Sequence, residues 1–118
     1  MSLALNIGSD DPDRLIEYYK NLFGKPFMEQ GGYASWEIGG GLITIGPHDE
    51  VSGKNTQPGR LLLSIMSPDA KADFERYKAA GAVVVRELYQ DKDAPQFWIA
   101  TFADPDNNYF QIVTREDG

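Results

Sequence analysis

The chain has 118 residues, 42% of them hydrophobic and 25% charged, and its net charge is −7. This composition predicts one globular domain with a sizeable core, and the acidity argues against nucleic acid or anionic membranes as partners. There is no cysteine and no apolar run long enough to cross a bilayer. We therefore expect no disulfide, no thiolate metal ligand, no membrane partner and a cytoplasmic location.

The first half of the chain is predicted to hold one strand, one helix and then two or three strands. Alternating apolar residues indicate a strand over residues 3–7. Asp11 and Pro12 are typical of a helix N-terminus, and Gly24 is expected to end that helix. Strands over residues 33–38 and 42–45 follow, joined by a glycine turn. The polar stretch that comes next is the best candidate for a linker.

The second half repeats this order. A strand over residues 60–66 precedes a helix expected to begin at Ser67 and Pro68 and to end at Gly81. Three strands follow, over residues 82–88, 97–103 and 109–114. Two modules, 1–57 and 58–118, within a single domain over 1–118, explain the recurrence. Chance recurrence of a common strand–helix unit is the alternative.

The last hairpin is the most informative stretch, with the sequence FADPDNNYFQIV over residues 102–113. Residues 104–108 form its turn, in which Asn107 is one of the few residue types that tolerate a left-handed backbone. Period-two alternation places Gln111 on the face opposite Phe110 and Ile112. We therefore expect Gln111 to present a polar group on one face of this strand, while Phe110 and Ile112 present apolar groups on the other.

Two motifs within this repeat resemble the vicinal oxygen chelate superfamily, which includes glyoxalase I, bleomycin resistance proteins and extradiol dioxygenases. One motif consists of Phe102, Asp104, Pro105, Asp106 and Asn108. The other is YYKNLFG over residues 18–24, similar to the family's helix end. The family usually has glycine where this chain has an asparagine after Asp106. The resemblance covers essentially the whole chain.

The resemblance implies an α+β fold in which two βαβββ modules form a curved eight-stranded cup, with helices outside and the ligand inside, and it implies a homodimer. Family enzymes hold a divalent metal through four strand positions. Here those positions carry Ala4, Thr44, Leu62 and Gln111, with Arg60 as an alternative third position. Alanine and leucine offer no lone pair, and glutamine stands where family enzymes have glutamate. We therefore expect no metal and no other cofactor.

Eight residues are predicted to bind the ligand. Gln111 offers two donors and one acceptor, and Trp36 would form an apolar wall if the glycine turn pairs Ile38 with Leu42. Both have an alternative reading: Gln111 as an ordinary strand residue, and Trp36 as core beneath a helix. The predicted set is Asn6, Trp36, Thr44, Leu62, Ser64, Ile99, Thr101 and Gln111. On the same pairing, Trp98 and Phe102 would pack outward against a helix.

No catalytic residue is predicted. His48 is the only histidine and lies in a polar loop, where an imidazole is usually solvated. Asp104 and Asp106 are expected to shape a turn rather than to form an acid–base pair. Gly39, Gly40 and Gly41 lack the following helix that a phosphate-binding loop requires.

The favoured function is a metal-independent small-molecule binding protein of the glyoxalase/bleomycin-resistance type, which would suit sequestration of a toxic compound or resistance to it. The ligand is expected to be aromatic or, given the acidic surface, cationic. One alternative is an enzyme, either a metal-dependent lyase or dioxygenase or a metal-free isomerase. Another is an interaction module whose cup is filled by its own side chains.

Overall fold

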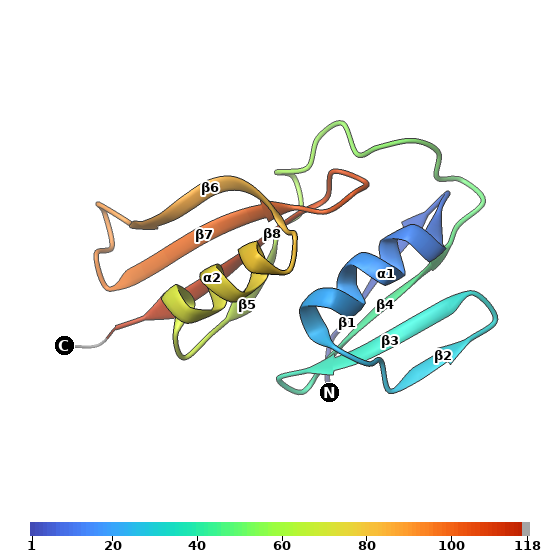
Figure 1. Cartoon of the computed structure of the whole chain (residues 1–118), viewed down its shortest axis with the longest axis horizontal. Helices are drawn as coiled ribbons and strands as arrows, with labels where there is room; N and C mark the ends of the chain where they lie inside the picture. Colours follow the sequence, from blue (N-terminus) through green and yellow to red (C-terminus); the bar gives the residue numbers. More distant parts are fainter. Residues whose placement is uncertain (117–118) are drawn as a thin grey trace. The chain divides into compact units, whose positions relative to one another are not determined.

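A computed structural model describes residues 1–116, which divide into two compact units. The first is Met1–Lys54 and the second begins at Asn55, whereas the sequence placed the division between residues 57 and 58. Each unit contains four strands and one helix in the order β-α-β-β-β (Figure 1). The predicted α+β fold of two βαβββ modules is therefore confirmed.

The first unit is a four-stranded sheet with one helix packed on it. The strands lie in the order β1-β4-β3-β2, with β1 parallel to β4 and the other pairs antiparallel. Helix α1 lies across one face of this sheet (Figure 1). The elements are β1 (Ala4–Ser9), α1 (Pro12–Phe23), β2 (Met28–Gln30), β3 (Tyr33–Ile38) and β4 (Gly41–Pro47).

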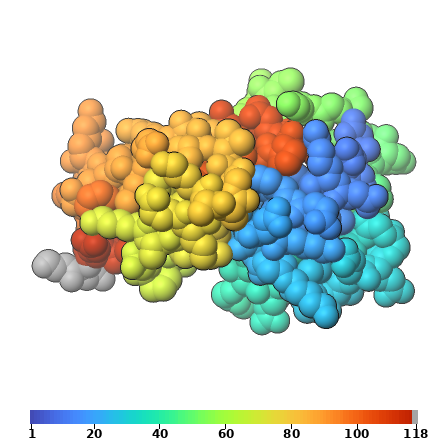
Figure 2. Space-filling view, in the orientation of Figure 1, coloured from blue at the N-terminus to red at the C-terminus, as the bar shows by residue number. Residues whose placement is uncertain are grey.

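The second unit has the same plan. Its strands lie in the order β5-β8-β7-β6, with β5 parallel to β8. The elements are β5 (Leu63–Met66), α2 (Ala70–Ala79), β6 (Val83–Gln90), β7 (Phe97–Ala103) and β8 (Tyr109–Arg115). The strand predicted over residues 60–66 therefore begins only at Leu63. Figure 2 shows the side of each unit that carries its helix, α1 in blue and α2 in yellow.

Both helices begin with the same capping arrangement. Asp11 is the N-cap of α1 and accepts a hydrogen bond from the Arg14 backbone N–H, as predicted. The N-cap of α2 is Asp69, so the predicted cap at Ser67 is wrong. Ser67 Oγ instead accepts from the Asp69 backbone N–H at 3.0 Å, just as Ser9 Oγ accepts from the Asp11 backbone N–H at 3.0 Å in the first unit. The repeat is thus serine, then aspartate two residues later.

The two cores differ in composition. In the first unit, Leu15 and Leu22 of α1 are buried against a sheet face that carries Ile43 and Ile45. In the second, aromatic rings fill the same place between α2 and its sheet. The Phe102 ring lies 5.3 Å from that of Phe110, 5.6 Å from that of Phe74 and 5.9 Å from that of Tyr77. Burying each such side chain contributes about 1.5–3 kcal/mol.

Asp104 organises the turn between β7 and β8. Its Oδ1 accepts hydrogen bonds from the backbone N–H groups of Asp106 and Asn108, and its Oδ2 accepts from the Asn108 side-chain amide. Asn107 adopts φ 63°, as the turn residues predict. Asn55 binds the same turn, since its backbone N–H donates to the Asp106 carbonyl at 2.8 Å. The acidic residues of this motif therefore have a structural role.

Neither α1 nor α2, the helices found within residues 1–116, is long and apolar enough to span a bilayer.

Candidate functional site

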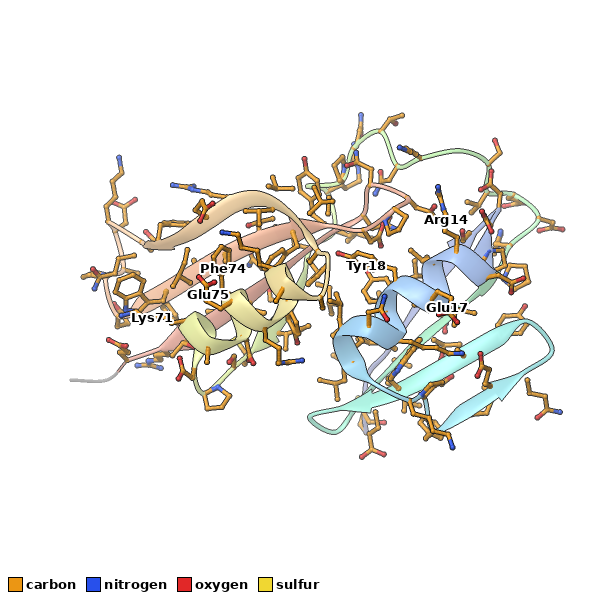
Figure 3. The ribbon with its side chains drawn as sticks, in the orientation of Figure 1. Arg14, Glu17, Tyr18, Lys71, Phe74 and Glu75 are labelled. Atoms are coloured by element: carbon orange, nitrogen blue, oxygen red, sulfur yellow. The ribbon has the colours of Figure 1, made fainter. Side chains whose placement is uncertain are left out.

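The second sheet has one helix-bearing face and one helix-free face. Phe110 and Ile112 are fully buried on the side of α2, and Phe74, labelled in Figure 3, reaches them from the helix. Alternation along β8 leaves Gln111 on the opposite, helix-free face. The sequence predicted this orientation correctly.

Strand register aligns three polar side chains on that helix-free face. Gln111 lies directly opposite Ser64 on β5 and opposite Thr101 on β7. Its Nε2 donates to Ser64 Oγ at 2.8 Å. Within residues 1–116, neither Gln111 Oε1 nor the Thr101 hydroxyl has a hydrogen-bond partner. We call these three residues the polar row.

Apolar residues flank the polar row on both sides. Ile99 pairs with Val113, and Val113 with Met66, which places all three on the helix-free face. On the other side of the row, Tyr109 pairs with Ala103. Predicted residue Leu62 lies just before β5 and is 45% exposed. Ser64, Ile99, Thr101 and Gln111 are thus brought together, and Leu62 lies at the end of the neighbouring strand.

Trp98 and Phe102, which alternate with Ile99 and Thr101 along β7, lie on the helix-bearing face, as predicted. The Trp98 ring lies beneath the ammonium group of Lys71, a residue of α2 labelled in Figure 3, at 4.3 Å. Phe102 stacks in the aromatic core. Both side chains therefore pack toward the helix, as the sequence indicated.

The first sheet has a corresponding row. Thr44 lies opposite Asn6 on β1 and Ser35 on β3, on the face away from α1. The hydroxyls of Ser35 and Thr44 are hydrogen bonded to each other at 2.8 Å, and Ser35 is buried. Much of the polar capacity of this row is therefore satisfied within the sheet. Asn6 is exposed and, within residues 1–116, its amide has no hydrogen-bond partner.

The orientation predicted for Trp36 is wrong. Ile38 pairs with Gly41 rather than with Leu42, so Trp36 lies opposite Ile43 instead of Thr44. A shift of one residue moves every side chain to the other face of the sheet. Trp36 is 3% exposed, and its Nε1 donates to the Gly24 carbonyl at 2.8 Å. It belongs to the core beneath α1, which was the alternative reading.

The helix-free face of the first sheet instead carries Tyr33, which the sequence did not suggest. A Cβ built on Gly46 would come within 2.1 Å of the Tyr33 ring, so the ring lies directly over that glycine. A Cβ on Gly8 would come within 2.8 Å of the Cβ of His48. Gly8 and Gly46 are paired across β1 and β4, so two neighbouring glycines make room for the Tyr33 ring and the His48 side chain. This packing could not be predicted from the sequence, because it depends on strand register.

The four positions that hold a metal in the resembling family do not fit one here. The side chains of Ala4 and Leu62 have no donor atom, and Gln111 offers only a neutral amide oxygen in place of a carboxylate. Among the described residues, no cluster of three or more His, Cys, Asp or Glu side chains is arranged to bind an ion. His48 is exposed, and its Nδ1 accepts from the Glu50 backbone N–H at 3.1 Å. The donor chemistry thus does not match the family's metal set.

Comparison with known proteins gives consistent results. No curated protein matches the sequence. TnmS3, described as an antibiotic binding protein from Streptomyces sp. CB03234, has a structure that matches at a TM-score of 0.75 and 18% identity, over 98% of this chain and 96% of that one. A glyoxalase/bleomycin resistance protein/dioxygenase family enzyme from Burkholderia phytofirmans PsJN matches at 0.73 and 19% identity, over 95% and 96%.

TioX from Micromonospora sp. ML1 matches at a TM-score of 0.73 and 20% identity, over 98% of this chain and 97% of that one. At these identities the likeness concerns the fold alone. The model of the glyoxalase-like domain family matches residues 3–113, nearly the whole chain. The βαβββ repeat, the turn built by Asp104 and the family match agree, and the chain belongs to the glyoxalase-like domain family.

Proposed function

We propose that the chain binds a small, partly apolar molecule on the helix-free face of the second sheet, without a metal ion. The polar row between two apolar rows carries this proposal. Gln111 Oε1 and the Thr101 hydroxyl remain available to a ligand, while Ile99 and Val113 offer apolar contact. Small-molecule sites combine such apolar surface with a few polar groups that fix orientation.

Binding is favoured over metal-dependent catalysis because the donor set lacks imidazole and carboxylate groups. The description of TnmS3 as an antibiotic binding protein supports a binding role for this fold, and the fold also supports enzymes. Sequestration of a toxic compound is the role that fits a binding protein. Asn6 and Thr44 in the first unit remain predicted ligand contacts.

The test is a titration of the full chain, in the presence of a chelator, with neutral, acidic and basic naphthalene derivatives. Backbone amide NMR spectra report which residues respond. We expect saturable shifts at β5, β7 and β8, centred on Gln111, and the same affinity when zinc replaces the chelator. If no derivative perturbs these amides, or if binding requires the added metal, the proposal is wrong.

A matched pair of variants locates the site. Gln111→Ala should weaken binding of naphthylmethanol roughly 3- to 10-fold, because one neutral hydrogen bond contributes about 0.5–1.5 kcal/mol. Gln96→Ala removes an exposed glutamine just before β7 and should leave the affinity unchanged. Equal effects of the two substitutions would place the site elsewhere.

A further inference from the structure

Strand β6 is irregular at the point where it borders the polar row. Val84 pairs with Phe102, but the next paired residue is Arg86, opposite Thr101. A second shift follows, because Tyr89 is the next residue paired and lies opposite Ile99. Each shift adds one residue to β6 relative to β7, which is the definition of a β-bulge.

The two shifts decide which face these side chains occupy. Simple alternation from Val84 would place Arg86 on the helix-bearing face. The extra residue places it opposite Thr101, on the helix-free face, in line with Ser64 and Gln111. The second extra residue brings Tyr89 to the same face. As a result, the guanidinium of Arg86 lies 3.6 Å from the centre of the Tyr89 ring.

Arg86 carries a positive charge in a row whose paired neighbours, Thr101, Gln111 and Ser64, are all neutral. It is exposed and forms no ion pair with any carboxylate within residues 1–116. None of the residues paired across the helix-free face of this sheet is acidic, although the chain has a net charge of −7. A second arginine, Arg115, shares this face, with its guanidinium 6.0 Å from the Phe97 ring.

We propose that Arg86 and Tyr89 form an anion subsite that binds the carboxylate of an aromatic acid. This inference rests on the proposed function and names the class of its ligand. Stacking on Tyr89 holds the guanidinium plane in place and leaves its N–H groups to bind a carboxylate in bidentate fashion. The Arg86 and Gln111 backbones lie two strand spacings apart, about 10 Å, which suits a bicyclic acid spanning both.

This proposal differs from the expectation of a cationic ligand drawn from net charge. Net charge sums over the whole surface, whereas recognition depends on the groups that face the ligand. The charged residue paired into the polar row is Arg86, so the preferred ligand is an anion.

Three probes with the same rings test the proposal: naphthoate, naphthylmethanol and naphthylmethylammonium, each titrated into the full chain and followed by amide NMR. We expect naphthoate to bind about tenfold more tightly than naphthylmethanol, and naphthylmethylammonium to bind most weakly. Naphthoate binding no tighter than the alcohol would overturn the anion subsite while leaving the proposed function standing. Absence of shifts with all three probes would overturn both.

Variants assign the preference to the arginine. Arg86→Gln should abolish the roughly tenfold advantage of naphthoate over naphthylmethanol. Arg86→Lys should restore only part of the advantage, because lysine lacks the planar fork. The matched control is Arg76→Gln, since Arg76 also stacks on an aromatic ring, that of Tyr77, but belongs to α2. Retention of the advantage by Arg86→Gln, with a thermal midpoint equal to that of the unmodified chain, would overturn the proposal.

Discussion

The two units share a topology but differ on the face away from the helix. In the first, the hydroxyls of Ser35 and Thr44 are bonded to each other, and Tyr33 lies over a glycine. In the second, Gln111 and Arg86 keep hydrogen-bonding capacity for a partner. Both halves nevertheless keep the same serine–aspartate cap and the same strand order. This difference is the reason for placing the proposed ligand site on the second sheet.

The cores differ as well, and this leads to the largest expected effect. Phe102→Ala should lower the free energy of unfolding by about 3–5 kcal/mol, because the ring is fully buried among three other aromatic rings. Urea denaturation measures the loss. Phe27→Ala is the control from the first unit, since Phe27 is 64% exposed, and it should change stability by no more than about 0.5 kcal/mol. A loss below 1 kcal/mol for Phe102→Ala would contradict the aromatic core.

The ring-over-glycine arrangement of the first unit has no counterpart at Gly59 or Gly81, the glycines of the second unit that the structure describes. Gly46→Ala should cost about 1–3 kcal/mol, because the new methyl group would overlap the Tyr33 ring. In the Tyr33→Ala background the same substitution should cost much less, which a double-mutant cycle by urea denaturation measures. Gly59→Ala is the control, since no atom lies within 4 Å of its Cβ position. Equal costs in both backgrounds would mean that the ring does not occupy this place.

The two tryptophans give a smaller contrast between the units. Trp36→Phe should cost about 1–2 kcal/mol, because it removes the hydrogen bond to Gly24 and leaves that carbonyl without its partner. Trp98→Phe should cost less, since the Trp98 Nε1 has no acceptor within residues 1–116. Denaturation of both variants measures the difference. Acrylamide should also quench Trp36 poorly in the Trp98→Phe variant, and efficient quenching would contradict burial of Trp36.

Trp36 also shows how far the sequence could be interpreted. Features set by neighbouring residues were predicted correctly, such as the Asp11 cap, the turn before Tyr109 and the alternation that orients Gln111. Strand register depends on the turn geometry: Gly39 and Gly40 both have positive φ, at 57° and 85°, and form a two-residue turn. The predicted turn was one residue longer, which placed Trp36 on the wrong face.

The bulges of β6 could not be predicted from the sequence, because they too depend on strand register. Residues 83–90 contain no glycine, and nothing in their pattern indicates where an extra residue enters the strand. Only the pairing with β7 shows that Arg86 and Tyr89 share a face with Gln111. Only part of the candidate site could therefore be predicted. The alternation of residues along β8 predicts the orientation of Gln111, whereas nothing in the sequence predicts that Arg86 and Tyr89 lie on the same face.

The turns that close the last hairpin of each unit use different residues, and substitutions there should change the free energy of unfolding by about 1 kcal/mol. The second unit uses Asn107 at φ 63° where the first uses Gly39 and Gly40. Asn107→Ala should lower the free energy of unfolding by about 1–2 kcal/mol. Alanine tolerates this backbone poorly, and the substitution removes the hydrogen bond from the Asn107 side-chain amide to the Asn55 carbonyl. Asn107→Gly keeps the backbone geometry and should stay within about 1 kcal/mol of the unmodified chain. Thermal denaturation ranks the two variants, and a more stable Asn107→Ala would contradict the turn.

The smallest effect at neutral pH concerns Tyr77 in the aromatic core, where burial raises the pKa of its phenol above the usual value near 10. Nearby Arg76 lowers this pKa and Asp73 raises it, both less than burial does. Because the folded state favours the neutral phenol, the stability that Tyr77 contributes is fully present below the pKa of the unfolded state and is lost as pH rises through the pKa of the folded state.

Lys20 in the first unit also makes stability fall at high pH, since its hydrogen bond to Glu29 raises the pKa of its ammonium group. Tyr77→Phe should therefore flatten only part of the fall in the free energy of unfolding above about pH 10. Urea denaturation across that range measures it, and an unchanged slope would mean that the Tyr77 phenol is not buried.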